Sequence, residues 1–229
     1  MAVAVMTCIS ILTAAVFTVR RAGKKDVVSV FLKTLASLSF ILLGFCAVRQ
    51  AGTFESSWLL IPALVVCLTG DIFLDLRYVD AQNAGAWTAG GFVSFILGHA
   101  CFLGYMLHGG ELLRLLPAAI LIGILGGIFI YITPGLMRLD YGRFRLLSAF
   151  YAAVLICTTA LAVLRAVQAP GTGSVLFAAG LVLFLLSDLV LSRVYFAEGG
   201  DTPFTCSLNH GLYYAAQILI ALSAAWIQG

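Results

Sequence analysis

The sequence predicts an all-α integral membrane protein, folded as one polytopic domain over residues 1–229 with a bundle of eight transmembrane helices. The first observation is the composition, because 62% of the 229 residues are hydrophobic and 10% are charged, against about 45–50% and about 25% in soluble domains. A soluble chain of this size cannot bury so much apolar surface, which excludes a soluble domain, a disordered chain and a nucleic-acid-binding protein. The second observation is that the apolar runs are continuous and lack the alternation of barrel strands, which selects helices.

Eight apolar runs supply the eight expected spans. At about 20 residues each they use roughly 160 positions, and only short loops remain. The first run has no basic leader before it, so we expect a retained span and not a secretory signal. The fifth contains Gly123, Gly126 and Gly127, which favour close packing within the bundle or against another copy, so the oligomeric state stays open. The runs are residues 2–19, 30–48, 57–76, 87–107, 112–132, 146–167, 174–196 and 204–227.

The positions of the basic residues predict the orientation of the bundle. Nine of the 13 Lys and Arg residues flank the loops of one side, and three flank the loops of the other. The positive-inside rule therefore places the nine in the cytoplasm and both termini outside. The nine are Arg20, Arg21, Lys24, Lys25, Arg77, Arg138, Arg143, Arg145 and Arg193, and the three are Arg49, Arg114 and Arg165.

Polar residues within the runs lie at similar depths. Charged groups in an apolar span are costly and normally face an internal cavity or a partner. Most of these residues fall in the cytoplasmic half of their run, with His99 nearer the midplane, so we expect one site in the cytoplasmic half of the bundle. They are Lys33 in the second run, Asp71 and Asp75 in the third, His99 in the fourth, Ser187 and Asp188 in the seventh, and Asn209, His210, Tyr213, Tyr214 and Gln217 in the eighth.

Several of these residues have simpler explanations. Lys33, Asp75 and Arg193 lie near the ends of their runs, from where a side chain can extend to the membrane interface. Tyr213 and Tyr214 are alternatively interfacial anchors. These interpretations stay open at the level of the sequence.

Asp71 and Asp188 are the strongest candidates for chemistry, because each follows a small residue inside a strongly apolar stretch. Two carboxyl groups that share a low-dielectric cavity cannot both stay ionised, so one is expected to keep its proton near neutral pH. The pair then supplies an acid and a base, which suits hydrolysis of a bond that breaks after protonation. The alternatives are salt bridges to Lys33 or Arg193 and, for His99, a satisfied core histidine.

Other chemistries lack a motif. The sequence has no Gly-x-Ser-x-Gly elbow, no His-Glu-x-x-His helix and no phosphate loop, and we expect no cofactor. The six cysteines show no CxxC or metal-type spacing and are interpreted as small buried hydrophobes. We expect no metal site, although a metal held by His99, Asp71 and Asp188 stays open because no spacing decides it.

A short internal similarity suggests two parallel four-helix repeats. Residues 70–74 (GDIFL) are similar to residues 187–191 (SDLVL), and residues 97–99 (LGH) are similar to residues 208–210 (LNH). Each match lies four runs apart, which is an even step, so both halves would point the same way around a shared central site.

The order of these polar motifs resembles that of the YhhN family of multi-pass membrane proteins, which includes the animal lysoplasmalogenases. The similarity covers essentially the whole chain. Phe102 stands where animal members carry Tyr, no Pro follows Lys33, and Asp75 is peculiar to this chain, whereas both candidate aspartates are intact. The matching motifs are Lys33, Gly70-Asp71, His99, Tyr151, Ser187-Asp188 and Tyr213-Tyr214-Ala-Ala-Gln217.

The resemblance implies an ether hydrolase that splits the vinyl ether of a lysoplasmalogen with water into a fatty aldehyde and glycerophospho-ethanolamine or -choline. Its catalytic acid/base pair would be Asp71 and Asp188, dividing the work as the two carboxylates of glycosidases do. Lys33 would bind the phosphate or tune the pair. Substrate or water would be positioned by His99, Tyr151, Ser187, Tyr213, Tyr214 and Gln217.

Other function classes stay open. A transporter or channel also carries polar residues at the midplane of two halves, and a lipid-binding protein without catalysis is a further alternative. An intramembrane aspartyl protease is disfavoured because Leu68 replaces the first Gly of a Gly-x-Gly-Asp motif and no Tyr-Asp partner is present. The expected partners are a lysophospholipid and the lipid bilayer. The short loops favour a bacterial inner membrane.

Overall fold

The computed structural model describes residues 1–55, 57–108 and 110–226 and is helical throughout, with no strand in these segments. The all-α prediction is confirmed, since each of the eight apolar runs forms a helix. The helices are α1 (Ala2–Gly23), α2 (Val27–Ala51), α3 (Leu60–Val79), α4 (Ala84–Leu107), α5 (Leu116–Ile132), α6 (Arg145–Gln168), α7 (Thr172–Phe196) and α8 (Pro203–Ser223). Short 3-10 turns at Ala81–Asn83, Leu113–Leu115, Gly142–Phe144 and Ala224–Trp226 adjoin them.

Local capping chemistry explains where several helices begin and end. Asp26 caps α2, accepting a hydrogen bond from the Ser29 amide at 2.9 Å, and this bond lowers the pKa of the Asp26 carboxyl. Thr202 caps α8 in the same way, and Pro203 follows in the first turn, where its missing amide proton costs nothing. Gly52 ends α2 in the left-handed conformation, with φ of +70°, which a glycine adopts without strain.

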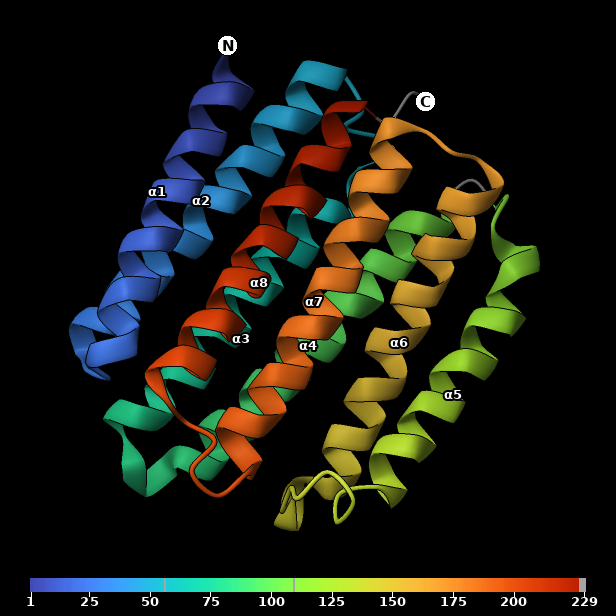
Figure 1. Ribbon diagram of the computed structural model, residues 1–229. Helices are drawn as coiled ribbons and strands as arrows, with labels where there is room; N and C mark the ends of the chain where they lie inside the picture. The colour runs from blue at the N-terminus through green and yellow to red at the C-terminus, as the bar shows by residue number, and fades with distance from the viewer. Residues whose placement is uncertain (56, 109, 227–229) are drawn as a thin grey trace.

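In the described part of the chain, helix contacts arrange six helices in a closed ring and leave α1 and α5 outside it. Figure 1 shows α1 and α5 at opposite sides of the bundle. Around the ring, contacts run from α2 to α3, α4, α6, α7 and α8 and back to α2. The outer helix α1 packs on α2 and α8, and the outer helix α5 packs on α6. The order of neighbours around the ring stays the same when α2 is exchanged with α6, α3 with α7 and α4 with α8, which is a step of four helices along the chain. Side chains that point into the ring therefore come from both halves of the sequence.

Glycines allow α5 to approach α6 closely. A Cβ atom added at Gly123 would lie 2.5 Å from the carbonyl oxygen of Ala153, and one at Gly127 would lie 2.8 Å from that of Ala149. Real side chains do not come so close to backbone, so only glycine permits this separation. The glycines of the fifth run thus pack within the bundle.

Successive helices alternate in direction, and both termini lie at one end of the bundle (Figure 1). The loops at the opposite end join α1 to α2, α3 to α4, α5 to α6 and α7 to α8. These are the loops that nine of the basic residues flank.

Within the described residues, six helices are long and apolar enough to cross a membrane by length and composition: α1, α2, α4, α5, α6 and α7. Charged Asp71, Asp75 and Arg77 set α3 apart from these, and α8 carries several polar residues on one face. Outward-facing side chains of α5 such as Leu121 and Leu125 are 58% exposed, which a bilayer accommodates and water does not. The fold is therefore that of a multi-pass helical membrane protein.

Candidate active site

Asp71 lies on α3 inside the ring and accepts hydrogen bonds from two neighbouring helices. Its Oδ2 receives the hydroxyl of Ser37 from α2 at 2.6 Å and that of Tyr213 from α8 at 2.8 Å. Its Oδ1 lies 3.5 Å from the ammonium of Lys33. The side chain is 2% exposed, so a buried carboxyl is held here by two hydroxyls and one cation.

Residues behind this group hold its donors in place. Gln217 donates from Nε2 to the Tyr213 hydroxyl at 3.0 Å, one helical turn further along α8. The Tyr214 hydroxyl lies 3.2 Å from that of Ser37. All of them are buried, so Tyr213 and Tyr214 are core residues here, and the interfacial-anchor interpretation is wrong.

Asp188 lies on α7 and accepts a hydrogen bond at Oδ2 from the Tyr151 hydroxyl on α6. The Ser187 hydroxyl lies 3.3 Å from Oδ1, and Asn209 on α8 donates to the Ser187 carbonyl at 2.8 Å, which ties α7 to α8 at this point. Asp188 is less buried than Asp71, because it faces an open cavity. Among the described residues no ion pair to Arg193 forms.

Both aspartates line one cavity, which we call the polar cavity. Phe95 lies between their tyrosine partners, with ring centroids 6.3 Å from Tyr151 and 6.1 Å from Tyr213. Segments 117 residues apart in the sequence thus meet at one place, as a single site requires. The polar cavity is lined by Arg21, Lys33, Asp71, Asp75, Asp188 and Tyr213, among others.

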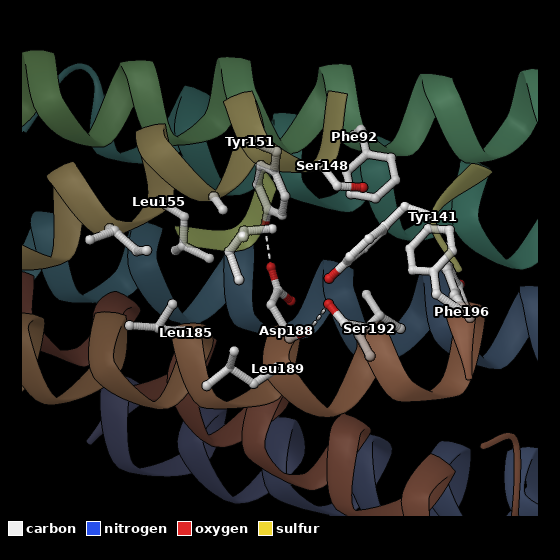
Figure 2. A pocket seen from close by; sticks show the side chains of 15 residues that line it. Phe92, Tyr141, Ser148, Tyr151, Leu155, Leu185, Asp188, Leu189, Ser192 and Phe196 are labelled. Atoms are coloured by element: carbon white, nitrogen blue, oxygen red, sulfur yellow. Dashed lines mark hydrogen bonds between the residues drawn. The ribbon is translucent and has the colours of Figure 1, made fainter. Parts of the chain in front are cut away.

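A second, mainly apolar cavity begins at Asp188 (Figure 2). It lies between α6 and α7, with α4, α5 and the α5–α6 loop contributing to its wall, and contains about 540 Å³ of empty space together with its open side. We call it the apolar cavity; its lining includes Phe92, Tyr141, Tyr151, Leu155, Leu185, Asp188, Leu189 and Phe196. Asp188 therefore stands in the wall that the apolar and polar cavities share.

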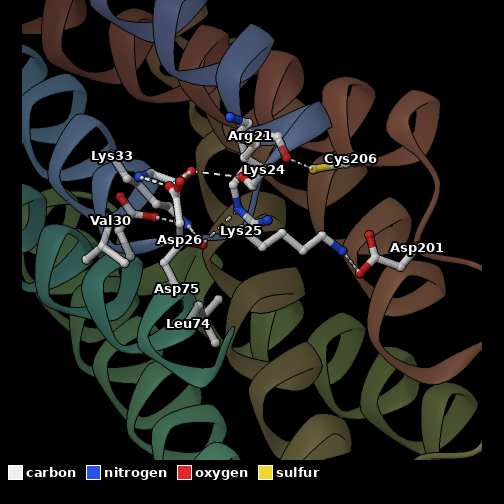
Figure 3. Close-up of polar contacts among 12 residues, drawn as sticks. Arg21, Lys24, Lys25, Asp26, Val30, Lys33, Leu74, Asp75, Asp201 and Cys206 are labelled. Carbon is white, nitrogen blue, oxygen red and sulfur yellow. Dashed lines mark hydrogen bonds and ion pairs between the residues drawn. The ribbon is translucent and has the colours of Figure 1, made fainter. Parts of the chain in front are cut away.

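Lys33 and Asp75 are buried in an ion cluster (Figure 3). The Lys33 ammonium lies 3.5 Å from Asp75 Oδ1, and Arg21 Nε lies 3.4 Å from the same oxygen. Both Lys33 and Asp75 are under 5% exposed, so the interpretation that they extend to the interface is wrong. Their opposite charges satisfy each other inside the bundle, which is cheaper than burying either one alone.

A protein-family comparison matches the sequence of this chain. The profile described as the YhhN family aligns with residues 28–224, which is most of the chain. The chain belongs to the YhhN family. No solved structure matches it.

The YhhN motif residues divide into those that reach a cavity and those that do not. Lys33, Asp71, Asp188 and Tyr213 line the polar cavity, and Tyr151 lines the apolar cavity. Ser187, Tyr214 and Gln217 lie behind them and act through hydrogen bonds.

His99 lines neither the polar nor the apolar cavity. It is fully buried among aromatic rings, 4.8 Å from Phe184 and 6.2 Å from Tyr151 between ring centroids. Neither ring nitrogen has a hydrogen-bond partner within the described part of the chain. His99 is thus a core histidine whose ring nitrogens lack hydrogen-bond partners among the described residues. The sequence had predicted either a site residue or a core histidine with its hydrogen bonds made.

Two lining residues that the sequence had placed among the polar residues of the site lie outside the family motifs. Asn209 and His210 line the polar cavity, and their place on the Tyr213 face of α8 was the available signal. Arg21 gave no such signal, because it was counted among the loop charges. Across the described residues no group of three or more His, Cys, Asp or Glu side chains could hold a metal ion.

Proposed function

We propose that this protein is a membrane-embedded ether hydrolase that cleaves the vinyl ether of lysoplasmalogens with water. The products would be a fatty aldehyde and glycerophospho-ethanolamine or -choline. Membership of the YhhN family, which includes lysoplasmalogenases, supports the reaction class. The observation that carries the proposal is the place of Asp188, in the wall between an apolar and a polar cavity, with Asp71 on the polar side.

A lysoplasmalogen has an apolar part and a polar part, which correspond to the apolar cavity and the polar cavity. Its hydrocarbon chain suits the apolar cavity, which has an open side and is lined mainly by apolar and aromatic side chains. Its glycerol and head group suit the polar cavity with Lys33 and Asn209. The vinyl ether joins chain to glycerol, so this placement brings the reacting bond to Asp188.

The two carboxyl groups can supply the chemistry. A protonated carboxyl transfers its proton to the outer alkene carbon, and an oxocarbenium ion forms next to the ether oxygen. An ionised carboxylate stabilises that cation and accepts a proton from the attacking water. The resulting hemiacetal collapses, releasing the aldehyde and the glycerol hydroxyl. Either Asp71 or Asp188 can serve as the acid in this scheme, with the other as the base.

Other residues would position this pair. Tyr151 holds Asp188 through its hydroxyl, while Ser37 and Tyr213 hold Asp71. Lys33 lies beside Asp71, where it tunes that carboxyl or meets the phosphate.

The membrane arrangement is part of the proposal. All eight helices would span the bilayer, α3 and α8 included, because the ring contacts shield their polar faces from lipid. The unchanged neighbour order on a step of four helices supports two parallel four-helix repeats. The concentration of basic residues at the loop end opposite the termini supports termini outside and a site in the cytoplasmic half of a bacterial inner membrane.

The test is aldehyde release from a lysoplasmenyl lipid by purified protein in detergent. Asp71→Asn and Asp188→Asn should each lower turnover about 100-fold or more, since each removes a proton donor or acceptor but keeps the side-chain shape. Asp140→Asn is the matched control, because Asp140 is exposed in a loop and its carboxylate accepts a hydrogen bond from the nearby Gly142 amide. Unchanged melting temperatures exclude misfolding. Near-normal turnover in both Asp71→Asn and Asp188→Asn would sink the proposal.

A transporter is the second candidate, favoured by the buried ion cluster of Arg21, Lys33 and Asp75 and by a ring built from both halves of the chain. The same preparation distinguishes the two. Uptake of a solute or lipid into vesicles, without aldehyde release, would assign transport.

A further inference from the structure

We propose that Arg21 and the cations around Tyr78 form a phosphate-binding subsite at the mouth of the polar cavity. The subsite rests on the proposed function, because it would receive the phosphate diester of the lysophospholipid head group. Arg21 lies near the end of α1, before the segment that the family profile matches.

Arg21 is a buried guanidinium with unused hydrogen-bonding capacity. Its side chain is 3% exposed and lines the polar cavity. Its Nε lies near Asp75, but its Nη1 donates no hydrogen bond to any described residue. Leaving a buried donor unpaired is costly, and the planar guanidinium matches a phosphate with two parallel hydrogen bonds. A phosphate in the cavity would accept the hydrogen bond that Nη1 of Arg21 has available.

Three cations surround one aromatic ring beside this donor. The guanidinium carbon of Arg21 lies 4.1 Å from the centroid of Tyr78, the Lys25 ammonium lies 4.8 Å away and the Arg77 guanidinium carbon 5.4 Å away. Tyr78 also lines the polar cavity. Like charges gathered this closely repel one another, and an anion placed among them relieves the repulsion.

The carboxylates nearby do not neutralise the group. Asp75 is shared by Arg21 and Lys33 through a single oxygen, and Asp201 pairs with Lys25. Arg77 forms no ion pair with any residue that the structure describes.

The other carboxylates that line the polar cavity are Asp71, which contacts Lys33, and Asp188. Around Tyr78 itself, the three cations Arg21, Lys25 and Arg77 have two carboxylate partners, Asp75 and Asp201, and Asp75 is also shared with Lys33. The excess positive charge lies toward the loops, on the side of Tyr78. With its phosphate bound there, the lipid would place its ether bond deeper in the cavity, near Asp71 and Asp188.

The test measures binding, which is independent of turnover. The probe is a lysophospholipid with a saturated alkyl ether, which lacks the alkene that hydrolysis needs, and the comparison ligand is the matching alkylglycerol without phosphate. In detergent, Arg21→Gln should weaken binding of the phosphate-bearing probe about tenfold or more, the usual value of a charge-assisted hydrogen bond. Binding of the alkylglycerol should stay within about twofold of wild type.

Arg20→Gln is the matched control. Arg20 is adjacent in sequence but pairs at 2.7 Å with the partly exposed Asp26, outside the cavity, and should leave both affinities unchanged. If Arg21→Gln fails to fold, the double variant Arg21→Gln with Asp75→Asn removes the buried pair together and should show the same selective loss. Arg21 variants that bind both ligands as wild type does, or lose both equally, overturn the subsite.

Further arms separate the possible sources of phosphate and the two proposals. Competition by millimolar inorganic phosphate that depends on Arg21 would assign the subsite to the free ion, and failure to compete would assign it to the lipid head group. Arg21-dependent binding without aldehyde release in the wild type would sink the hydrolase and keep the subsite. Aldehyde release by the wild type, together with binding that does not depend on Arg21, would keep the hydrolase and overturn the subsite.

Discussion

The substitution Tyr151→Phe removes one hydroxyl oxygen and tests the hydrogen bond that holds Asp188 in the wall shared by the two cavities. The Tyr151 hydroxyl donates to Asp188 Oδ2, and the Ser187 Oγ lies 3.3 Å from Oδ1. The ring itself packs against Phe92 and Phe95, with centroids 5.4 and 6.3 Å away. Phenylalanine keeps these contacts, so the variant isolates the hydrogen bond.

The expected loss follows from the kind of bond removed. A hydrogen bond to a charged group contributes about 1.5–3 kcal/mol, and about 1.4 kcal/mol of activation free energy corresponds to a tenfold change in rate. Turnover by Tyr151→Phe should therefore fall about 10- to 100-fold, with a smaller change in KM. Turnover by Asp188→Asn should fall further, because this substitution removes the carboxylate itself.

The assay is aldehyde release under saturating lysoplasmenyl lipid. Tyr105→Phe is the matched control, because Tyr105 and Tyr151 are both 6% exposed. Tyr105 packs on Phe177 at 5.5 Å between ring centroids and lines neither cavity. Turnover of Tyr151→Phe within twofold of wild type, or an equal loss in Tyr105→Phe, would refute the role of the hydrogen bond to Asp188.

Two predictions concern stability, measured as melting temperature in detergent. Gly123→Ala should melt lower than Gly126→Ala, since the added Cβ meets a backbone oxygen of α6 at 2.5 Å in the first case and the flexible tip of an isoleucine in the second; equal losses would contradict this packing. Hydrogen bonds from Asn83 and Trp87 hold the pKa of Asp80 below its usual value, so their stabilisation is complete above about pH 4 and disappears as pH falls through the folded-state pKa. Asp80→Asn should thus melt lower than wild type at pH 7, and the difference should close in acid; a difference independent of pH would contradict it.

The helices and their polar residues could be read from the sequence because both depend on local pattern. A continuous apolar run forms a helix wherever it lies in the bundle, and the spacing of Asn209, Tyr213 and Gln217 by four residues already placed them on one face of α8. The rarity of charge likewise drew attention to Asp71 and Asp188. These conclusions need no knowledge of which helices are neighbours.

The tertiary structure alone decided how these residues meet. The bond from Tyr213 to Asp71 spans 142 residues, and the contact of Tyr214 with Ser37 spans 177. Such contacts depend on which helices become neighbours in the ring, and periodicity within a helix carries no information about that. The same reason explains Arg21, which a count of loop charges places at the interface. Packing of α1 against α2 and α8 buries it beside Asp75 instead, at the mouth of the polar cavity.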